Sequence, residues 1–137
     1  MNNQRSELSG RNKYWIPKFR YLELKNFCLQ YPDWKIVLAS IDPLKSHFSK
    51  ISSGKISDPT NDLAIRRLEI MNNISLVETC ASLADPSIAS FLIKGITENY
   101  SYDYLKYQLG LPAGRDYYYD RYRKFFWILD KKRERPL

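Results

Sequence analysis

Aromatic side chains gather near the two ends of this chain, and no other feature restricts its fold as strongly. Of the 20 aromatic residues, seven lie between Tyr14 and Trp34 and eleven lie between Tyr100 and Trp127. Large rings have to be buried in a folded protein, so we expect the two segments to pack against each other. A chain of 137 residues is also about the size of one ordinary domain. We therefore expect residues 1–137 to form a single domain.

Apolar residues recur at helical spacing, and no segment between residues 14 and 133 shows the alternation of a strand. The sequence therefore predicts an all-α fold, a compact helical bundle. Prolines and capping carboxylates mark the helix starts, since both suit the first turn of a helix. We expect helices at residues 17–30, at 32–40, over about the 26 residues that follow Asp58-Pro59, and from Asp85-Pro86 to about Glu98.

Two segments show no sustained helical period. We expect residues 1–12 to form a flexible arm and residues 41–57, which are rich in Ser, Lys and Gly, to form a loop.

The helix that follows Asp58-Pro59 is apolar on two sides. One narrow stripe contains Leu63, Ile70, Ile74, Val77 and Ala81, and the other side contains Ile65, Leu68, Leu76 and Leu83. Such a helix is usually central in a bundle or is partly buried by a second subunit. A second copy of this chain is therefore a candidate partner.

The last third of the chain predicts a helix-turn-helix over residues 101–133. Ser101 is a good N-cap, and Leu105 and Leu109 fall on one face of the helix that follows. Gly110 supplies the left-handed residue that commonly ends a helix, Leu111 follows as a hydrophobic plug, and a proline prevents continuation. A short helix, a turn and a longer basic helix form the arrangement that places a helix in a DNA groove.

The helix expected over 115–133 has a core face and a polar face. The core face contains Tyr118, Tyr122, Phe125 and Leu129 with Phe126 at its edge, and the opposite side contains Asp116, Asp120, Arg123, Lys124, Trp127 and Lys131. The first turns of a recognition helix meet base edges, and basic residues further along meet phosphates. The predicted contacts with double-stranded DNA are Arg115, Tyr117, Tyr119, Asp120, Arg121, Arg123 and Lys124. A basic outer face is also common in helix hairpins that bind no nucleic acid, so a solvent-exposed face without a ligand is the alternative. For Trp127 the alternative is packing under the N-terminal aromatic residues.

The net charge of +7 is unevenly distributed, because residues 1–35 carry +4, residues 36–100 carry −1 and residues 101–137 carry +4. Two basic ends around a neutral middle indicate an anionic partner. The alternative is the ordinary solubility charge of a small domain.

SYDYLKYQLGL followed by RDYYYDRYRKFF resembles the C-terminal half of phage-encoded late-transcription regulators of the RinA/ArpU type from Gram-positive hosts. Those regulators are similar to the sigma-factor region that reads promoters through a helix-turn-helix. The likeness covers roughly residues 100–130, and Pro-Ala-Gly before Arg115 makes the turn about two residues longer than the usual pattern. The resemblance implies a transcription regulator in the cytoplasm of a bacterial host cell, acting beside RNA polymerase. The resemblance implies a role in DNA contact for Arg115, Tyr117, Tyr119 and Arg121.

Other classes of site are not indicated. His47 has no nearby Cys or His partner for a metal, and neither a phosphate-binding Gly loop nor a Gly-x-Ser-x-Gly motif occurs. We therefore expect no enzyme, no cofactor and no metal. Cys28 and Cys80 fall in apolar helical patterns, where free cysteine behaves as a small hydrophobe, although a disulfide between them stays an alternative. No run is long and apolar enough to span a membrane, and the start MNNQRSELSG lacks a signal-peptide core, so we expect no membrane partner.

A second function class stays open. Tyrosine, tryptophan and arginine together are also typical of protein–protein hot spots. The alternative to DNA binding is therefore an interaction module, an inhibitor or co-regulator that docks on a host or phage protein through its Tyr/Arg-rich face.

Overall fold

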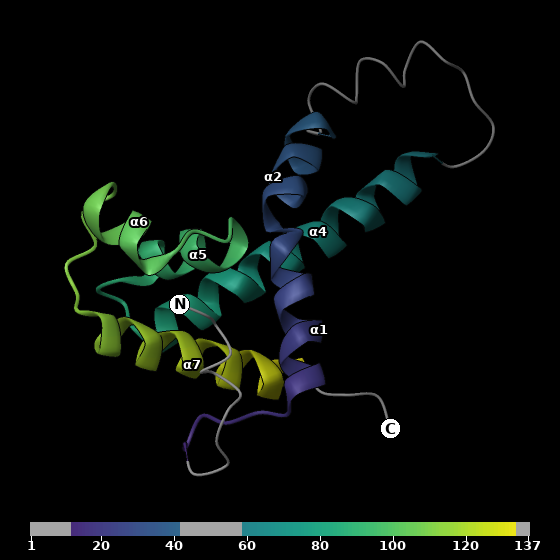
Figure 1. The fold of residues 1–137 in the computed structure, drawn as a ribbon. Coiled ribbons are helices and arrows are strands. Elements are labelled where there is room, and N and C mark those ends of the chain that lie inside the picture. Colours follow the sequence, from purple (N-terminus) through teal and green to yellow (C-terminus); the bar gives the residue numbers. More distant parts are fainter. Residues whose placement is uncertain (1–11, 42–58, 134–137) are drawn as a thin grey trace.

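The computed structural model describes residues 12–41 and 59–133. Within these ranges the chain forms helices and turns and contains no strand, so the predicted all-α class is confirmed (Figure 1). Apart from Asn12 and Ile41, the arm and the loop that we predicted lie outside the described residues. None of the helices described is both long and apolar enough to cross a membrane.

The first two helices lie where the sequence predicts them, α1 at Lys18–Leu29 and α2 at Tyr31–Ser40. Helix α1 is buried along Tyr21, Leu24 and Cys28. Phe19 is 79% exposed, although it is apolar and belongs to the same helix. Apolar spacing therefore located this helix without identifying its buried face, because apolar residues occur on more than one side of it.

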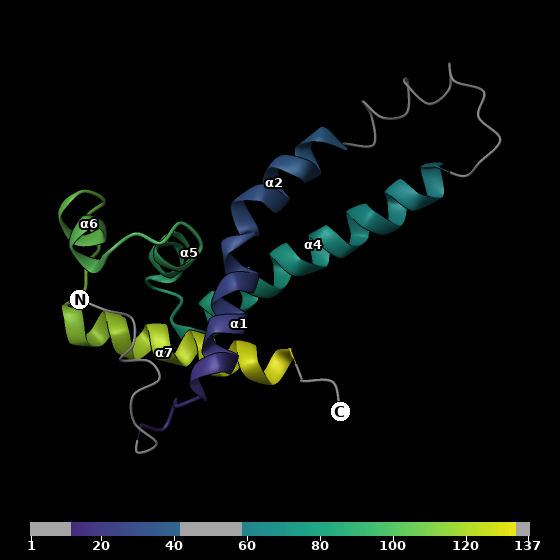
Figure 2. The ribbon, with the colours of Figure 1, turned by 45° about the vertical axis from the view of Figure 1, so that its right-hand side comes forward.

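The long helix α4, Pro59–Ala84, has two different environments along its length. Its second half packs against α5 and α7 and buries Val77, Cys80 and Ala81. Its first half runs beside α2, and in both views this pair extends away from the rest of the molecule (Figures 1 and 2). Most of the second apolar side that the sequence predicts is left open, since Ile65, Leu68 and Leu83 are exposed, whereas Leu76 is partly buried against the core.

Helix α5, Ala89–Thr97, begins after a turn rather than directly at Asp85-Pro86. The Asp85 carboxylate accepts hydrogen bonds from the Ser87 backbone N–H at 2.9 Å and from the Ser87 hydroxyl at 2.6 Å. Asp85 therefore caps a turn that leads into the helix. The inward face of α5 contains Leu92, Gly95 and Ile96.

Helices α6, Tyr102–Tyr107, and α7, Arg115–Lys132, are joined by the turn that the sequence predicts. The Ser101 hydroxyl oxygen accepts a hydrogen bond from the Tyr104 N–H at 3.1 Å, so Ser101 is the N-cap of α6. Gly110 has a φ of +77°, which favours glycine. Leu111 is buried after it, and its N–H donates to the Leu105 carbonyl at 2.9 Å. The turn is thus closed by backbone geometry and by one buried side chain.

Helix α7 lies at the centre of the fold, in contact with α1, α4 and α5. It buries six side chains: Tyr118, Tyr119, Tyr122, Phe125, Phe126 and Leu129. The ring of Tyr21 in α1 meets that of Phe126 edge-on at 5.0 Å between centroids, and its hydroxyl lies 2.7 Å from that of Tyr122. The predicted packing between the N-terminal and C-terminal aromatic segments is therefore confirmed.

Both cysteines are free and fully buried, Cys28 in α1 and Cys80 in α4, so the disulfide alternative does not hold. Burial raises the pKa of both thiols, that of Cys80 to about 11. Both act as small apolar core residues.

A close approach between α5 and α7 gives a stability prediction. A Cβ atom at Gly95 would lie 2.2 Å from the Tyr118 hydroxyl oxygen and 2.9 Å from Leu105 Cδ1. We expect Gly95→Ala to lower the free energy of unfolding by about 1–3 kcal/mol, because the packed neighbours have to move. Chemical denaturation followed by circular dichroism measures this change.

Tyr118→Phe provides the matched test of that cause. The Tyr118 hydroxyl is buried and has no hydrogen-bond partner among the described residues, so its removal costs little and makes room for the new methyl group. Gly95→Ala combined with Tyr118→Phe should recover part of the lost stability. Equal losses in the single and double variants would contradict the proposed overlap.

Candidate nucleic-acid interface

The outward side of α7 is a narrow stripe, because α1, α4, α5 and α6 cover the other sides. In the first half of α7 the stripe contains the exposed residues Asp116 and Tyr117. It continues along the helix through Asp120 and Lys124, which are partly exposed. Lys131 is exposed near the end of the helix. This stripe contains part of the set predicted to contact DNA.

Arg115 lies at the leading end of α7 and is joined to α6. Its side chain is 38% exposed, and its Nη2 donates to Asp103 Oδ1 at 2.9 Å. The guanidinium carbon also lies 4.8 Å from the centroid of the Tyr102 ring. Arg115 is therefore positioned by two side chains of the preceding helix, and it remains partly open to solvent.

Tyr117 and Arg121 form a cluster with Asp85, which precedes α5. The Tyr117 hydroxyl donates to Asp85 Oδ2, and the Arg121 guanidinium carbon lies 4.9 Å from the Tyr117 ring centroid. Arg121 Nε is 3.5 Å from Asp85 Oδ2, and the Arg121 side chain is only 27% exposed. Much of the charge of Arg121 is therefore balanced within the molecule.

Asp85 is buried, and its charge state depends on this cluster. Burial alone would raise the pKa of its carboxyl group, but hydrogen bonds from Ser87 and Tyr117 and the charge of Arg121 outweigh burial and hold the pKa below its ordinary value. The carboxylate is therefore ionised at neutral pH. The sequence explains Asp85 only as the start of a helix. It does not reveal the contact with α7, because residues 32 and 36 positions apart share no local pattern.

Tyr119 does not lie on the surface, and its predicted exposure is corrected by the structure. The residue is 6% exposed, and its ring lies 5.0 Å from that of Tyr118 and 5.7 Å from that of Tyr122. Tyr102 of α6 also approaches it, at 6.4 Å between ring centroids. The sequence predicts Tyr119 as a DNA contact, whereas α6 covers this side of α7.

The remaining predicted residues, Asp120, Arg123 and Lys124, are partly exposed. Asp120 Oδ2 lies 3.6 Å from Arg121 Nη1. Neither Arg123 nor Lys124 forms an ion pair with a carboxylate of the described residues. The acids that face outward thus lie in the first half of α7, and unbalanced positive charge begins at Arg123.

Trp127 follows on the same side of α7 and takes the alternative that we left open. Its ring meets that of Tyr14 edge-on at 5.5 Å between centroids, so an N-terminal aromatic residue covers it in part.

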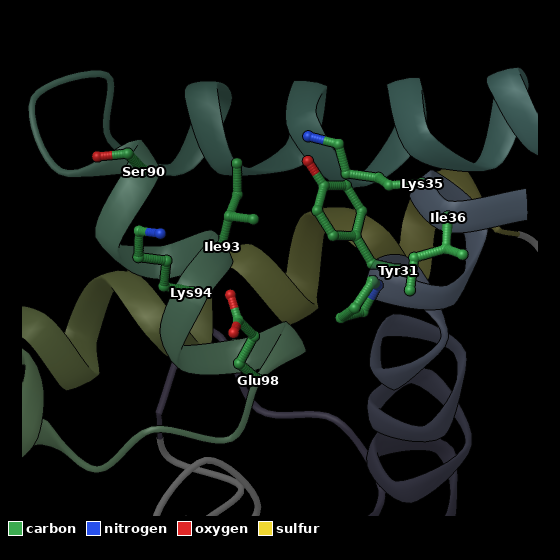
Figure 3. Close-up of a pocket in the computed structure, with 8 residues that line it drawn as sticks. Tyr31, Lys35, Ile36, Ser90, Ile93, Lys94 and Glu98 are labelled. Carbon is green, nitrogen blue, oxygen red and sulfur yellow. The ribbon is translucent and has the colours of Figure 1, made fainter. Parts of the chain in front are cut away.

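A hollow of about 450 Å³ opens elsewhere, between α2 and α5 (Figure 3). Lys35 and Ile36 line it from α2, and Ile93 and Lys94 line it from α5. The Tyr31 hydroxyl at its edge already donates to Glu78 Oε2 at 2.6 Å. The described part of the chain contains no group of three or more His, Cys, Asp or Glu residues that could hold a metal ion.

Comparisons with known proteins identify no relative. No protein-family model, curated protein or solved structure shows significant similarity to this chain.

The Asp85 cluster gives a prediction for stability and its pH dependence. Asp85→Asn removes the charge that receives the Tyr117 hydroxyl and faces Arg121, and we expect it to lower the free energy of unfolding by about 1–3 kcal/mol at pH 7. Because the pKa of Asp85 is lower in the folded protein, its ionised form stabilises the fold above the ordinary carboxyl pKa of 3.8. The difference between wild type and variant should therefore shrink as the pH falls below that value. Urea titrations between pH 3 and pH 7 measure it.

Asp116→Asn is the control, since Asp116 is an exposed carboxylate in the first turn of α7 that forms no ion pair with Arg121 among the described residues. We expect a change of about 0.5 kcal/mol or less. A loss as large as that of Asp85→Asn would show that the cluster has no special role.

Proposed function

We propose that this protein is a sequence-specific DNA-binding transcription regulator that reads the major groove with α7. The supporting observation is the arrangement of α6, turn and α7. Gly110 and Leu111 close the turn, and the first turns of α7 are left open at Asp116 and Tyr117. In this proposal α6 and α7 form a helix-turn-helix, and α5 supports them from within the bundle.

The proposed contacts divide along α7. Arg115 and Tyr117 at its leading end meet base edges, with Asp120 one turn further on. Arginine has five N–H donors, so Arg115 keeps donors for a guanine edge beside its bond to Asp103. Aspartate accepts from cytosine and repels phosphate, which suits Asp120 to the groove rather than to the backbone. Arg123 and Lys124 meet phosphates, and Arg121 holds the leading half of α7 through Asp85.

The resemblance to RinA/ArpU-type regulators supports a phage or mobile-element origin. In this proposal the protein acts in the cytoplasm of the bacterial host, beside RNA polymerase on double-stranded DNA. It works without a cofactor and is not an enzyme.

Charge removal in the second half of α7 tests the proposal. If wild type contacts about five phosphates, log K should fall with log salt at a slope of about −4 to −5. Arg123→Ala with Lys124→Ala should weaken binding to every duplex and reduce the slope by about two. Fluorescence anisotropy with a labelled promoter duplex from the element's own genome, measured at several salt concentrations, gives both quantities.

The absence of binding by wild type at low salt would overturn the proposal. A slope near zero would do so as well, because a helix that lies along a duplex has to displace counterions.

A protein-interaction module is the second candidate, and one observation favours it. Helix α4 leaves four large apolar side chains exposed, Ile65, Leu68, Met71 and Leu83, and Ile36 is exposed on the neighbouring α2. Exposed apolar side chains that lie close together are typical of protein interfaces. For this second candidate we propose a surface on the α2–α4 pair rather than on the Tyr/Arg-rich face, with a host or phage protein or a second copy of the chain as the partner.

Two substitutions separate the candidates. Ile65→Glu with Leu68→Glu should abolish self-association or partner capture, because charges cannot be buried there without compensation. The same variant should bind DNA as wild type does. Size-exclusion chromatography with light scattering and the anisotropy assay measure the two properties, and a monomeric wild type that captures no partner would exclude an interface on this surface.

A further inference from the structure

The N-terminal end of the described chain lies against the second half of α7. The Tyr14 ring meets the Trp127 ring edge-on at 5.5 Å between centroids. Lys13 Nζ lies 5.1 Å from the centroid of the Tyr14 ring, and Lys131 Nζ lies 4.4 Å from that of Trp127. One aromatic pair therefore holds together two lysines from opposite ends of the sequence. Both lysines are exposed.

Acidic side chains do not neutralise this surface. From residue 121 to residue 132 the only acid of α7 is Asp130, and its Oδ1 accepts a hydrogen bond from Arg20 Nε at 2.6 Å. Lys13 and Lys131 form no ion pair with a carboxylate within residues 12–41 and 59–133. The first half of α7 differs, because Asp103 and Asp85 lie beside its arginines there.

We propose that Lys13 and Lys131, held on the Tyr14–Trp127 pair, form a second contact with the phosphate backbone of the duplex. The inference rests on the DNA-binding function proposed above and extends its footprint to a residue outside the predicted helix-turn-helix. The ligand is the phosphodiester backbone, without regard to base sequence.

The position of the pair suits this role. The leading end of a recognition helix enters the groove, and its far end approaches the backbone. Lysine acts as a compact point charge with three rotatable donors, which favours phosphate over the directional pattern of base edges. The rings restrict where both ammonium groups lie, so fewer conformations are lost on binding than with free lysine side chains.

The test compares two double variants with the same charge change. Lys13→Gln with Lys131→Gln removes the proposed contact. Lys35→Gln with Lys94→Gln removes two exposed lysines at the hollow between α2 and α5 (Figure 3). The control is matched in a further respect, since Lys35 Nζ also lies over a ring, 5.4 Å from the Tyr31 centroid. Binding is measured by anisotropy with a labelled mixed-sequence duplex at several salt concentrations, because phosphate contacts do not depend on sequence.

We expect the salt slope of Lys13→Gln/Lys131→Gln to be smaller than that of wild type by about two, with affinity about 10- to 100-fold weaker near 0.1 M salt. The control pair should keep the wild-type slope. Lys13→Arg with Lys131→Arg retains both charges and should restore binding, which separates charge from any loss of packing. Thermal unfolding of all variants checks that they fold.

The outcomes separate the two proposals. If wild type does not bind the duplex, the DNA-binding function fails and this contact fails with it. If wild type binds with a steep salt slope and the Lys13/Lys131 pair shows no greater change than the Lys35/Lys94 pair, the second contact alone is overturned. A fall in slope confined to the Lys13/Lys131 pair and reversed by arginine supports it.

Discussion

Burial of the aromatic face of α7 is the interaction on which the rest of the structure depends. Tyr118, Tyr122 and Phe126 lie along one side of a helix that also carries nine charged side chains. The hydrophobic gain from covering these rings draws the N-terminal helix α1 and the much later helix α5 onto the same helix. The polar ends of the rings are used as well, because the hydroxyl of Tyr122 lies 2.7 Å from that of Tyr21 and accepts from Lys25 Nζ at 3.1 Å. The centre of the fold and the candidate site are therefore two sides of one helix.

Because α7 is both a core helix and part of the candidate site, its packing decides which of its charges are balanced by neighbouring carboxylates. Where neighbouring segments come close, they bring carboxylates to the arginines, Asp103 to Arg115 and Asp85 to Arg121. The positive charge that no carboxylate of residues 12–41 and 59–133 balances is found further along, where Tyr14 lies against Trp127. A net charge of +7 alone does not describe this division. Only part of the basic helix is open to an anionic partner, and its two halves differ in what they offer.

Element positions could be predicted because their causes are local. Ser101 caps α6, Gly110 adopts positive φ and Leu111 is buried behind the turn, and each follows from its immediate neighbours. Exposure could not be predicted in the same way. Phe19 is exposed and Tyr119 is buried. A helical wheel gives only the direction in which each side chain leaves its own helix, so it cannot tell which direction another helix covers. Which angle is covered depends on neighbours that come from distant parts of the chain.

The amino-acid sequence by itself determined the all-α class, the positions of the helices, the turn between α6 and α7, and the meeting of the two aromatic segments. Helical period, capping and the need to bury large rings all act at short range or through composition, so they can be read from the order of residues. The tertiary structure alone decided that Asp85 holds Tyr117 and Arg121, that α6 covers Tyr119, and that Lys13 and Lys131 lie over the two rings of one aromatic pair. Each of these contacts joins segments that are separated in the sequence but lie close together in space.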